Sequence, residues 1–131
     1  PSLDALCKAS EDQLRQLGFG YRAKFIVTSA QQVRELGGDE WLQGLRSLSK
    51  EEVQEKLVAL SGVGPKVADC VALFSMDQTS CIPVDTHVLQ ITKKCFLPSL
   101  ATCKSITPRI YKAIGDAWET RFGVYAGWAH T

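Results

Sequence analysis

The chain has 131 residues, 45% of them hydrophobic, so it is long enough for one globular domain with a core and too short for two ordinary domains. Fifteen basic and fourteen acidic residues leave a net charge of +1, which excludes an overall electrostatic field that would draw the chain onto nucleic acid. Any binding to nucleic acid must therefore come from a local arrangement of residues.

The five cysteines are an odd number and contain no CxxC pair. This pattern argues against a disulfide framework and against a zinc or iron–sulfur site, and it favours a reducing compartment. The sequence also lacks an apolar run of about 18 residues and a basic-then-apolar start, so it predicts neither a membrane span nor a secretory signal. We expect an intracellular, soluble protein without a side-chain metal site. The start without methionine and the end inside a helical pattern indicate a fragment of a longer protein.

Helix signals dominate in chain order and predict an all-α fold. Residues 10–13 (SEDQ) and 49–52 (SKEE) each fit a capping box that opens an amphipathic helix. Between them, residues 21–36 carry apolar side chains at close to a 3.6-residue period, and a pair of glycines ends that helix. A short helix is expected at about residues 41–48.

Residues 65–76 predict a further helix, which we expect to be well buried. Its apolar stripe consists of Val67, Val71 and Phe74. Together with the helix that follows Ser49, it forms a predicted helix-hairpin-helix motif over about residues 50–77, with the turn at residues 60–64 (LSGVG).

Three further segments complete the predicted helices. Asp85 can N-cap a helix over residues 86–94, because its carboxylate can accept hydrogen bonds from the free amides of the first turn. A Thr-Pro pair opens a helix over residues 107–122, and a truncated helix covers residues 124–130. The sequence thus predicts seven helices and a truncated eighth in a single helical domain over residues 1–131.

The turn of the hairpin is suited to contact a phosphate. Gly62 and Gly64 allow a tight turn and a close approach to a ligand, and Pro65 fits the first turn of a helix whose free N–H groups attract an anion. The amides of Gly62, Val63 and Gly64 could position nucleic acid without reading its sequence. The alternative is that a GxG between helices is only a tight turn.

Lys66 and Asp85 are the candidate reactive pair. The helix dipole and partial burial would both disfavour the ammonium form of Lys66, so we expect a neutral amine that can attack carbon and form a Schiff base. The alternative is an ordinary solvated lysine. Asp85 is either only an N-cap or, if it lies near Lys66, also a carboxylate that stabilises a cation or assists proton transfer.

Four segments in order carry a family resemblance: residues 17–23 (LGFGYRA), 62–70 (GVGPKVADC), 83–87 (PVDTH) and 123–129 (GVYAGWA). They resemble the helix-hairpin-helix superfamily of DNA base-excision glycosylases and, within it, the eukaryotic-type 8-oxoguanine DNA glycosylases. The similarity runs through essentially the whole chain. The resemblance implies part of the catalytic helical domain, without the N-terminal α/β domain and the C-terminal end of the parent protein. It also implies that the isolated fragment is weakly active or inactive.

The resemblance implies a DNA glycosylase with AP lyase activity that excises 8-oxoguanine from duplex DNA during base-excision repair. Lys66 matches the Schiff-base nucleophile of the family and Asp85 its essential aspartate. Enzymes of this type flip the damaged base out of the duplex, displace it at C1′, and cut the strand by β-elimination.

Six further positions match binding residues of the family. Those matching the base pocket are Cys70, Pro83 and His130. Those matching DNA contacts are His87, Tyr21 and Arg22. Each also has an ordinary structural explanation as a core, loop or surface residue. Position 130 is commonly glutamine in the family, so the preferred lesion stays open.

Two other functions compete with this interpretation. An endonuclease III-type glycosylase for oxidised pyrimidines shares the hairpin lysine and the VDTH segment but usually carries four closely spaced cysteines, which this sequence lacks. A non-catalytic helix-hairpin-helix module would bind DNA without chemistry, and the Lys66 and Asp85 pair argues against it. The alkyladenine branch typically lacks the lysine.

The resemblance further implies a monomer that acts on double-stranded DNA with a damaged base, without a membrane, in the nucleus and with the mitochondrion as a second compartment. No cofactor is required. A cation held by the hairpin's backbone carbonyls is compatible with the motif.

Overall fold

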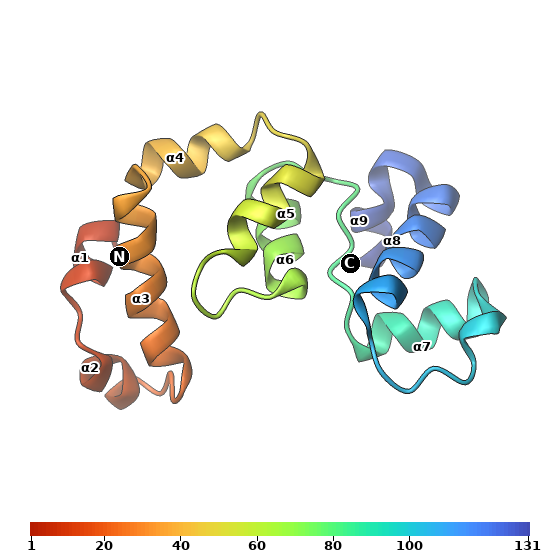
Figure 1. Cartoon of the computed structure of the whole chain (residues 1–131), viewed down its shortest axis with the longest axis horizontal. Coiled ribbons are helices and arrows are strands. Elements are labelled where there is room, and N and C mark those ends of the chain that lie inside the picture. The colour runs from red at the N-terminus through yellow and green to blue at the C-terminus, as the bar shows by residue number, and fades with distance from the viewer. The chain divides into compact units, whose positions relative to one another are not determined.

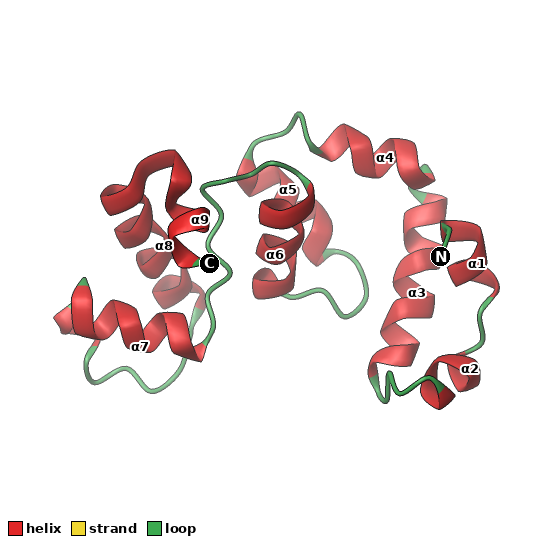
Figure 2. Ribbon diagram, turned by 180° about the vertical axis from the view of Figure 1, so that it is seen from behind, coloured by secondary structure: helices red, strands yellow, loops and turns green.

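The computed structural model describes residues 1–131, and its regular elements are all helices (Figure 1; Figure 2). The α-helices are α1 Leu3–Lys8, α2 Glu11–Gln16, α3 Arg22–Glu35, α4 Gly38–Leu45, α5 Lys50–Val58, α6 Pro65–Ser75, α7 Thr86–Cys95, α8 Pro108–Phe122 and α9 Ala126–His130. Two short 3-10 turns, η1 Pro98–Leu100 and η2 Gly123–Tyr125, complete the set. The predicted all-α fold is confirmed. The chain divides into two compact units, Pro1–Gly64 and Pro65–Thr131.

Both predicted capping boxes are confirmed, and both lie in the first unit. The Ser10 hydroxyl accepts from the Gln13 amide, and the Gln13 side chain accepts from the Ser10 amide at 2.9 Å. Ser49 and Glu52 form the same reciprocal pair at the start of α5. Each box satisfies two backbone N–H groups that would otherwise lack partners at a helix start.

The first unit differs from the predicted helices in two places. Helix α1 was not predicted; it is only six residues long, buries no residue and depends on a Ser2 cap, so it leaves no apolar period in the sequence. The helix expected at residues 41–48 begins earlier, at Gly38, and ends at Leu45. The structure therefore has nine α-helices instead of seven and a truncated eighth.

Helix α3 is the centre of the first unit. Helices α1, α2 and α4 each contact it (Figure 1). Its buried residues are Ala23, Ala30 and Val33. Near its end, the Gln32 side chain accepts a hydrogen bond of 2.7 Å from the Ser61 amide, which attaches the hairpin turn to α3.

The second unit contains helices α7, α8 and α9 around one apolar cluster. The cluster consists of Ile82, Val84, Val88, Leu89, Ile114, Trp118 and Ala126. The predicted bounds of α7 and α8 are confirmed to within one residue at each end, and Thr107 and Asp85 cap the two helices with their side chains. The last predicted helix is divided, because the 3-10 turn η2 precedes α9.

The predicted buried stripe of α6 is wrong at Val67 and Phe74, whereas Val71 is half-buried. Val67 is 43% exposed and Phe74 is 64% exposed. The buried face of the helix is formed instead by Ala68, Asp69, Ala72 and Leu73. The prediction followed the large apolar side chains, whereas the small alanines are the residues that allow a neighbouring element to come close.

Candidate active site

The hairpin turn, residues 60–64, lies at the end of the first unit. Gly62 has a φ of +77°, and a Cβ at this position would lie 2.4 Å from Cγ of Phe25, so only glycine fits. Gly64 differs, because its φ is not positive and a Cβ there would meet open space. The turn therefore depends on Gly62 for its shape and leaves Gly64 open to an approaching ligand.

Two of the three predicted hairpin amides are available to a ligand. The Val63 amide already donates to the Leu60 carbonyl at 3.1 Å. The amides of Gly62 and Gly64 make no hydrogen bond within the protein. A phosphate could thus be held by the two glycine amides, while Val63 stabilises the turn.

Lys66 is the second residue of α6, at the start of the second unit. The expected partial burial is wrong, because its side chain is exposed. Its ammonium group forms neither a hydrogen bond nor an ion pair with the protein. An exposed amine without a partner is accessible to a ligand at the helix N-terminus.

Asp85 caps α7 with one of its two carboxylate oxygens. Oδ1 accepts from the amides of His87 and Val88, each at 2.9 Å. Oδ2 accepts no hydrogen bond from the protein. Capping and chemistry are therefore compatible at this residue, since they would use different oxygens.

The pKa of Asp85 is lowered below its ordinary value. The hydrogen bond from Val88 is the main cause, the one from His87 and the positive charges of His87 and Lys66 add to it, and burial acts in the opposite direction. Asp85 is therefore ionised at neutral pH and is suited to stabilise a cation. The charge of Lys66 lowers the pKa of Asp85 although the two side chains form no ion pair, so space remains between the amine and the carboxylate.

His130 interacts electrostatically with both Lys66 and Asp85. Burial lowers its pKa, the charge of Lys66 adds to this effect, and the Asp85 carboxylate opposes it. Its ring lies edge-on to Trp118, with centroids 6.3 Å apart, and its Nδ1 atom is buried without a hydrogen-bond partner. A polar nitrogen is thus left unsatisfied near the predicted reactive pair.

A close backbone contact holds α9, and with it His130, in place. Gly127 donates from its amide to the Thr79 carbonyl at 2.8 Å. A Cβ on Gly127 would lie 2.5 Å from the Cys81 carbonyl oxygen, so no other residue fits without displacement. The contact attaches α9 to the loop that leads to Pro83.

The two other predicted pocket residues lie on the elements that carry the reactive pair. Cys70 is half-buried on α6, one turn after Lys66, and Pro83 is fully buried two residues before Asp85. The imidazole of His87 is exposed next to the capping Asp85. The second unit therefore contains Lys66, Asp85, His130, Cys70, Pro83 and His87.

Tyr21 and Arg22 lie in the first unit, at the start of α3. Tyr21 is 65% exposed, and the Arg22 guanidinium lies over its ring at 4.9 Å from the centroid. The ring also packs edge-on against Phe25 at 6.2 Å. An exposed aromatic side chain beside a cation is suited to contact bases and phosphates.

Sequence reasoning missed two polar residues of the second unit. Asp69, on the buried face of α6, accepts a hydrogen bond of 2.5 Å from the hydroxyl of Tyr111 on α8. They are 42 residues apart in the sequence, and no local pattern connects them. The only sequence signal is a carboxylate directly between alanine and cysteine in the apolar helix that follows Lys66.

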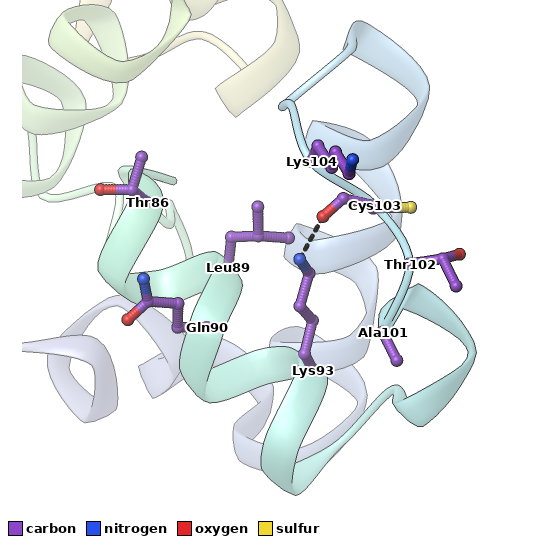
Figure 3. A pocket seen from close by; sticks show the side chains of 8 residues that line it. All are labelled: Thr86, Leu89, Gln90, Lys93, Ala101, Thr102, Cys103 and Lys104. Atoms are coloured by element: carbon purple, nitrogen blue, oxygen red, sulfur yellow. Dashed lines mark hydrogen bonds between the residues drawn. The ribbon is translucent and has the colours of Figure 1, made fainter.

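A pocket of about 500 Å³ lies along α7 and is not the predicted site (Figure 3). Its lining residues are Thr86, Leu89, Gln90, Lys93, Ala101, Thr102, Cys103 and Lys104. Lys93 crosses it to donate to the Cys103 carbonyl oxygen. None of the predicted site residues lines this pocket.

No three histidine, cysteine, aspartate or glutamate side chains are grouped so that they could hold a metal ion, and all five cysteines are free. No helix is both long and apolar enough to cross a membrane. A cation at the hairpin carbonyls stays a prediction.

The sequence of residues 1–116 matches the HhH-GPD superfamily of base excision DNA repair proteins. The chain belongs to this superfamily. The match includes the hairpin, Lys66 and Asp85, so the family resemblance predicted from the four motifs is confirmed.

Two curated relatives in this superfamily are N-glycosylase/DNA lyases. The chain is 50% identical over 133 residues to the N-glycosylase/DNA lyase OGG1 of Arabidopsis thaliana, which covers 100% of the chain and 36% of that relative. It is 36% identical over 148 residues to the N-glycosylase/DNA lyase of Saccharomyces cerevisiae, covering 93% of the chain and 39% of that relative. The chain thus spans less than two-fifths of the length of either relative.

Solved structures of 8-oxoguanine glycosylases have a similar fold. The Clostridium acetobutylicum 8-oxoguanine glycosylase/lyase, in complex with double-stranded DNA containing cytosine opposite 8-oxoguanine, matches with a TM-score of 0.78 and 32% identity, over 99% of this chain and 41% of that chain. MBOgg1 in complex with a low-affinity DNA ligand matches with a TM-score of 0.81 and 28% identity, over 99% and 42%.

Proposed function

We propose that the protein containing this chain is a DNA glycosylase with AP lyase activity that removes 8-oxoguanine from duplex DNA. The observation that carries the proposal is an exposed Lys66 at the start of α6 together with an Asp85 carboxylate that keeps one oxygen free while it caps α7, in a chain of the HhH-GPD superfamily. Relatives named as N-glycosylase/DNA lyase and as 8-oxoguanine glycosylase/lyase support the substrate class.

In the first step, Lys66 gives up a proton to water and its amine attacks C1′ of the damaged nucleotide. The bond from C1′ to the base nitrogen breaks, and the base leaves with the electron pair and takes up a proton. The free Oδ2 of Asp85 faces the positive charge that develops on the sugar. The C1′–O4′ bond then opens, O4′ takes up the proton that the amine releases, and a Schiff base joins Lys66 to C1′.

In the second step, C2′ loses a proton to water. The electrons of its C–H bond form a double bond, and the bond between C3′ and its phosphate oxygen breaks, so the phosphate leaves with the electron pair. Water hydrolyses the remaining imine and returns Lys66 as the free amine. These two reaction steps need no oxidant or reductant, and therefore no redox cofactor.

The other site residues are proposed to hold the DNA. Phosphate contacts are assigned to the amides of the hairpin, at Gly62 and Gly64, and to His87. Tyr21 and Arg22 would enter the duplex around the flipped nucleotide, and the residues proposed to surround the base are Cys70, Pro83 and His130. Their support is the exposure of Tyr21 and Arg22, the free glycine amides and the unsatisfied Nδ1 of His130.

Borohydride trapping tests the chemistry. The protein is incubated with duplexes that carry 8-oxoguanine, thymine glycol, an abasic site or no lesion. Borohydride is then added, and the yield of covalent protein–DNA adduct is measured. We expect adducts with 8-oxoguanine and abasic DNA. An adduct with thymine glycol in place of 8-oxoguanine would indicate an endonuclease III-type enzyme, and binding without any adduct would indicate a non-catalytic module.

Two substitutions of Lys66 serve as matched controls. Lys66→Gln should abolish the adduct and leave DNA binding nearly intact. Lys66→Arg keeps the positive charge without a nucleophilic amine, so it should also give no adduct. An adduct that persists in Lys66→Gln would exclude Lys66 as the nucleophile.

We further propose that the protein is a monomer located in the nucleus, with the mitochondrion as a second compartment. A role in DNA repair supports this location, because the substrate is found in these compartments. Fluorescence imaging of the tagged protein tests the location, and sedimentation with and without DNA tests the oligomeric state.

A further inference from the structure

The hydroxyl of Tyr111 connects the two segments that carry the reactive pair. Tyr111 lies on α8, and its hydroxyl donates to Oδ2 of Asp69 on α6 at 2.5 Å. The same hydroxyl accepts from the backbone amide of Val84 at 3.2 Å. The Ile82 carbonyl oxygen lies farther away, at 3.3 Å, and Asp69 is therefore the main acceptor of the single hydroxyl proton.

Asp69 and Val84 are close in the sequence to the two residues of the reactive pair. Asp69 comes three residues after Lys66, within one turn of α6. Val84 directly precedes Asp85. One hydroxyl group therefore links the helix of the lysine to the backbone that leads into the aspartate.

The network is buried, which makes it costly to disturb. Asp69 is 5% exposed and Val84 is 2% exposed. A carboxylate and an amide in such a place need hydrogen-bond partners, and the Tyr111 hydroxyl serves both. Burial and the Asp69 carboxylate raise the pKa of Tyr111, so the hydroxyl keeps its proton and remains a donor.

We propose that Tyr111 and Asp69 are positioning residues that set the separation between the Lys66 amine and the Asp85 carboxylate. The inference rests on the proposed function, because it concerns the same reaction. Neither residue touches the substrate. Each acts on the position of Lys66 or Asp85, and a small displacement of a reacting group lowers the reaction rate strongly.

The test is Tyr111→Phe, which keeps the ring and removes the hydroxyl. We expect the single-turnover rate of adduct formation with abasic duplex to fall roughly 10- to 100-fold, while the dissociation constant for the same duplex changes less than about threefold. Asp69→Asn, whose side-chain oxygen still accepts from Tyr111, should lose less activity than Tyr111→Phe. If Tyr111→Phe fails to fold, Asp69→Ala, which removes the acceptor of the Tyr111 proton, replaces it and should show the same loss of rate.

Ile114→Val on the same helix is the control for stability. Ile114 is fully buried, and the substitution removes one methylene without touching the network, at a cost typical of a core truncation. If Tyr111 only stabilised the fold, both variants would keep the wild-type rate at a temperature where both are folded. Equal rates in Tyr111→Phe and Ile114→Val would overturn the inference and leave the proposed function intact. No adduct from the unchanged protein would reject both.

A double-mutant cycle gives a second readout. Asp85→Asn should reduce the rate less in the Tyr111→Phe background than in the wild type, because the carboxylate is already misplaced there. A strictly structural tyrosine would give additive effects, and additivity would also overturn the inference.

Discussion

The side chain of Phe25 occupies the space into which a Cβ at residue 62 would project. A Cβ at residue 62 would lie 2.4 Å from Cγ and 2.5 Å from Cβ of Phe25, and the backbone of Gly62 has a φ of +77°. Helix α3 and the hairpin turn are thus in contact at a point where only glycine is tolerated.

Gly62→Ala should therefore destabilise the protein by about 1–3 kcal/mol, because it combines a strained φ with a clash against Phe25. Denaturant unfolding followed by circular dichroism measures the change. Gly64→Ala is the matched control, since its Cβ meets open space at an unstrained φ, and it should change stability by less than about 0.5 kcal/mol. Equal losses in the two variants would contradict the explanation.

The parts of the site that could be predicted from sequence are those fixed by local chemistry. A carboxylate before an apolar helix predicts an N-cap, and Asp85 accepts from two amides of α7. Serine three residues before glutamine or glutamate predicts a capping box, and both boxes form. Such interactions involve residues within one turn, so the sequence contains both partners.

The parts that could not be predicted depend on tertiary contact. The buried face of α6 is decided by what packs against it, and the small Ala68 and Ala72 carry no periodic signal of their own. Asp69 would be placed on a solvated face by its charge, yet Tyr111 from another helix satisfies it in the core. The exposure of Lys66 was likewise outside what a helix pattern determines.

Two substitutions of Asp85 should distinguish its contribution to stability from its contribution to catalysis. Asparagine is as good an N-cap as aspartate, so Asp85→Asn should keep stability within about 0.5 kcal/mol while lowering the rate of base release on the order of 100-fold. Asp85→Ala should lower the rate to a similar extent and in addition cost about 1 kcal/mol of stability. Unfolding curves and single-turnover kinetics measure the two effects. A fully active Asp85→Asn would limit the residue to capping.

The lowered pKa of Asp85 predicts how this stabilisation depends on pH. The folded pKa lies below the ordinary value of 3.8, so the contribution of the ionised side chain is complete above that value and is lost as the pH falls through the folded pKa. The difference in unfolding free energy between wild type and Asp85→Ala should shrink over this acid range. A difference that stays constant from neutral pH to the acid limit would argue against the shift.

Thr92 joins α7 to α8 in the core of the second unit. Its hydroxyl accepts from the Trp118 indole at 2.8 Å and donates to the Val88 carbonyl at 2.7 Å, and the residue is fully buried. Thr92→Val keeps the shape but leaves the indole N–H unpaired, so it should cost about 1–3 kcal/mol. Thr92→Ser, which keeps the hydroxyl and loses one methyl group, should cost less, about 1 kcal/mol. Thermal unfolding decides the order of the two variants.

His130 reports directly on whether the candidate site is assembled. Its folded pKa lies below the ordinary value of 6.5, so its contribution to stability is complete above that pH and is lost as the pH falls through the window between 6.5 and the folded pKa. Proton NMR can follow the imidazole, since the chain has two histidines and His130→Gln removes one of the two signals.

Two substitutions should move the midpoint of the His130 titration in opposite directions. Asp85→Asn removes a carboxylate that raises the pKa of His130, so the midpoint should fall further. Lys66→Gln removes a positive charge that lowers the pKa, so the midpoint should rise. Replacement of Lys112, an exposed lysine paired with Asp116 on α8, is the control and should leave the midpoint unchanged. If neither Asp85→Asn nor Lys66→Gln moves the midpoint, the three residues do not share one site in solution.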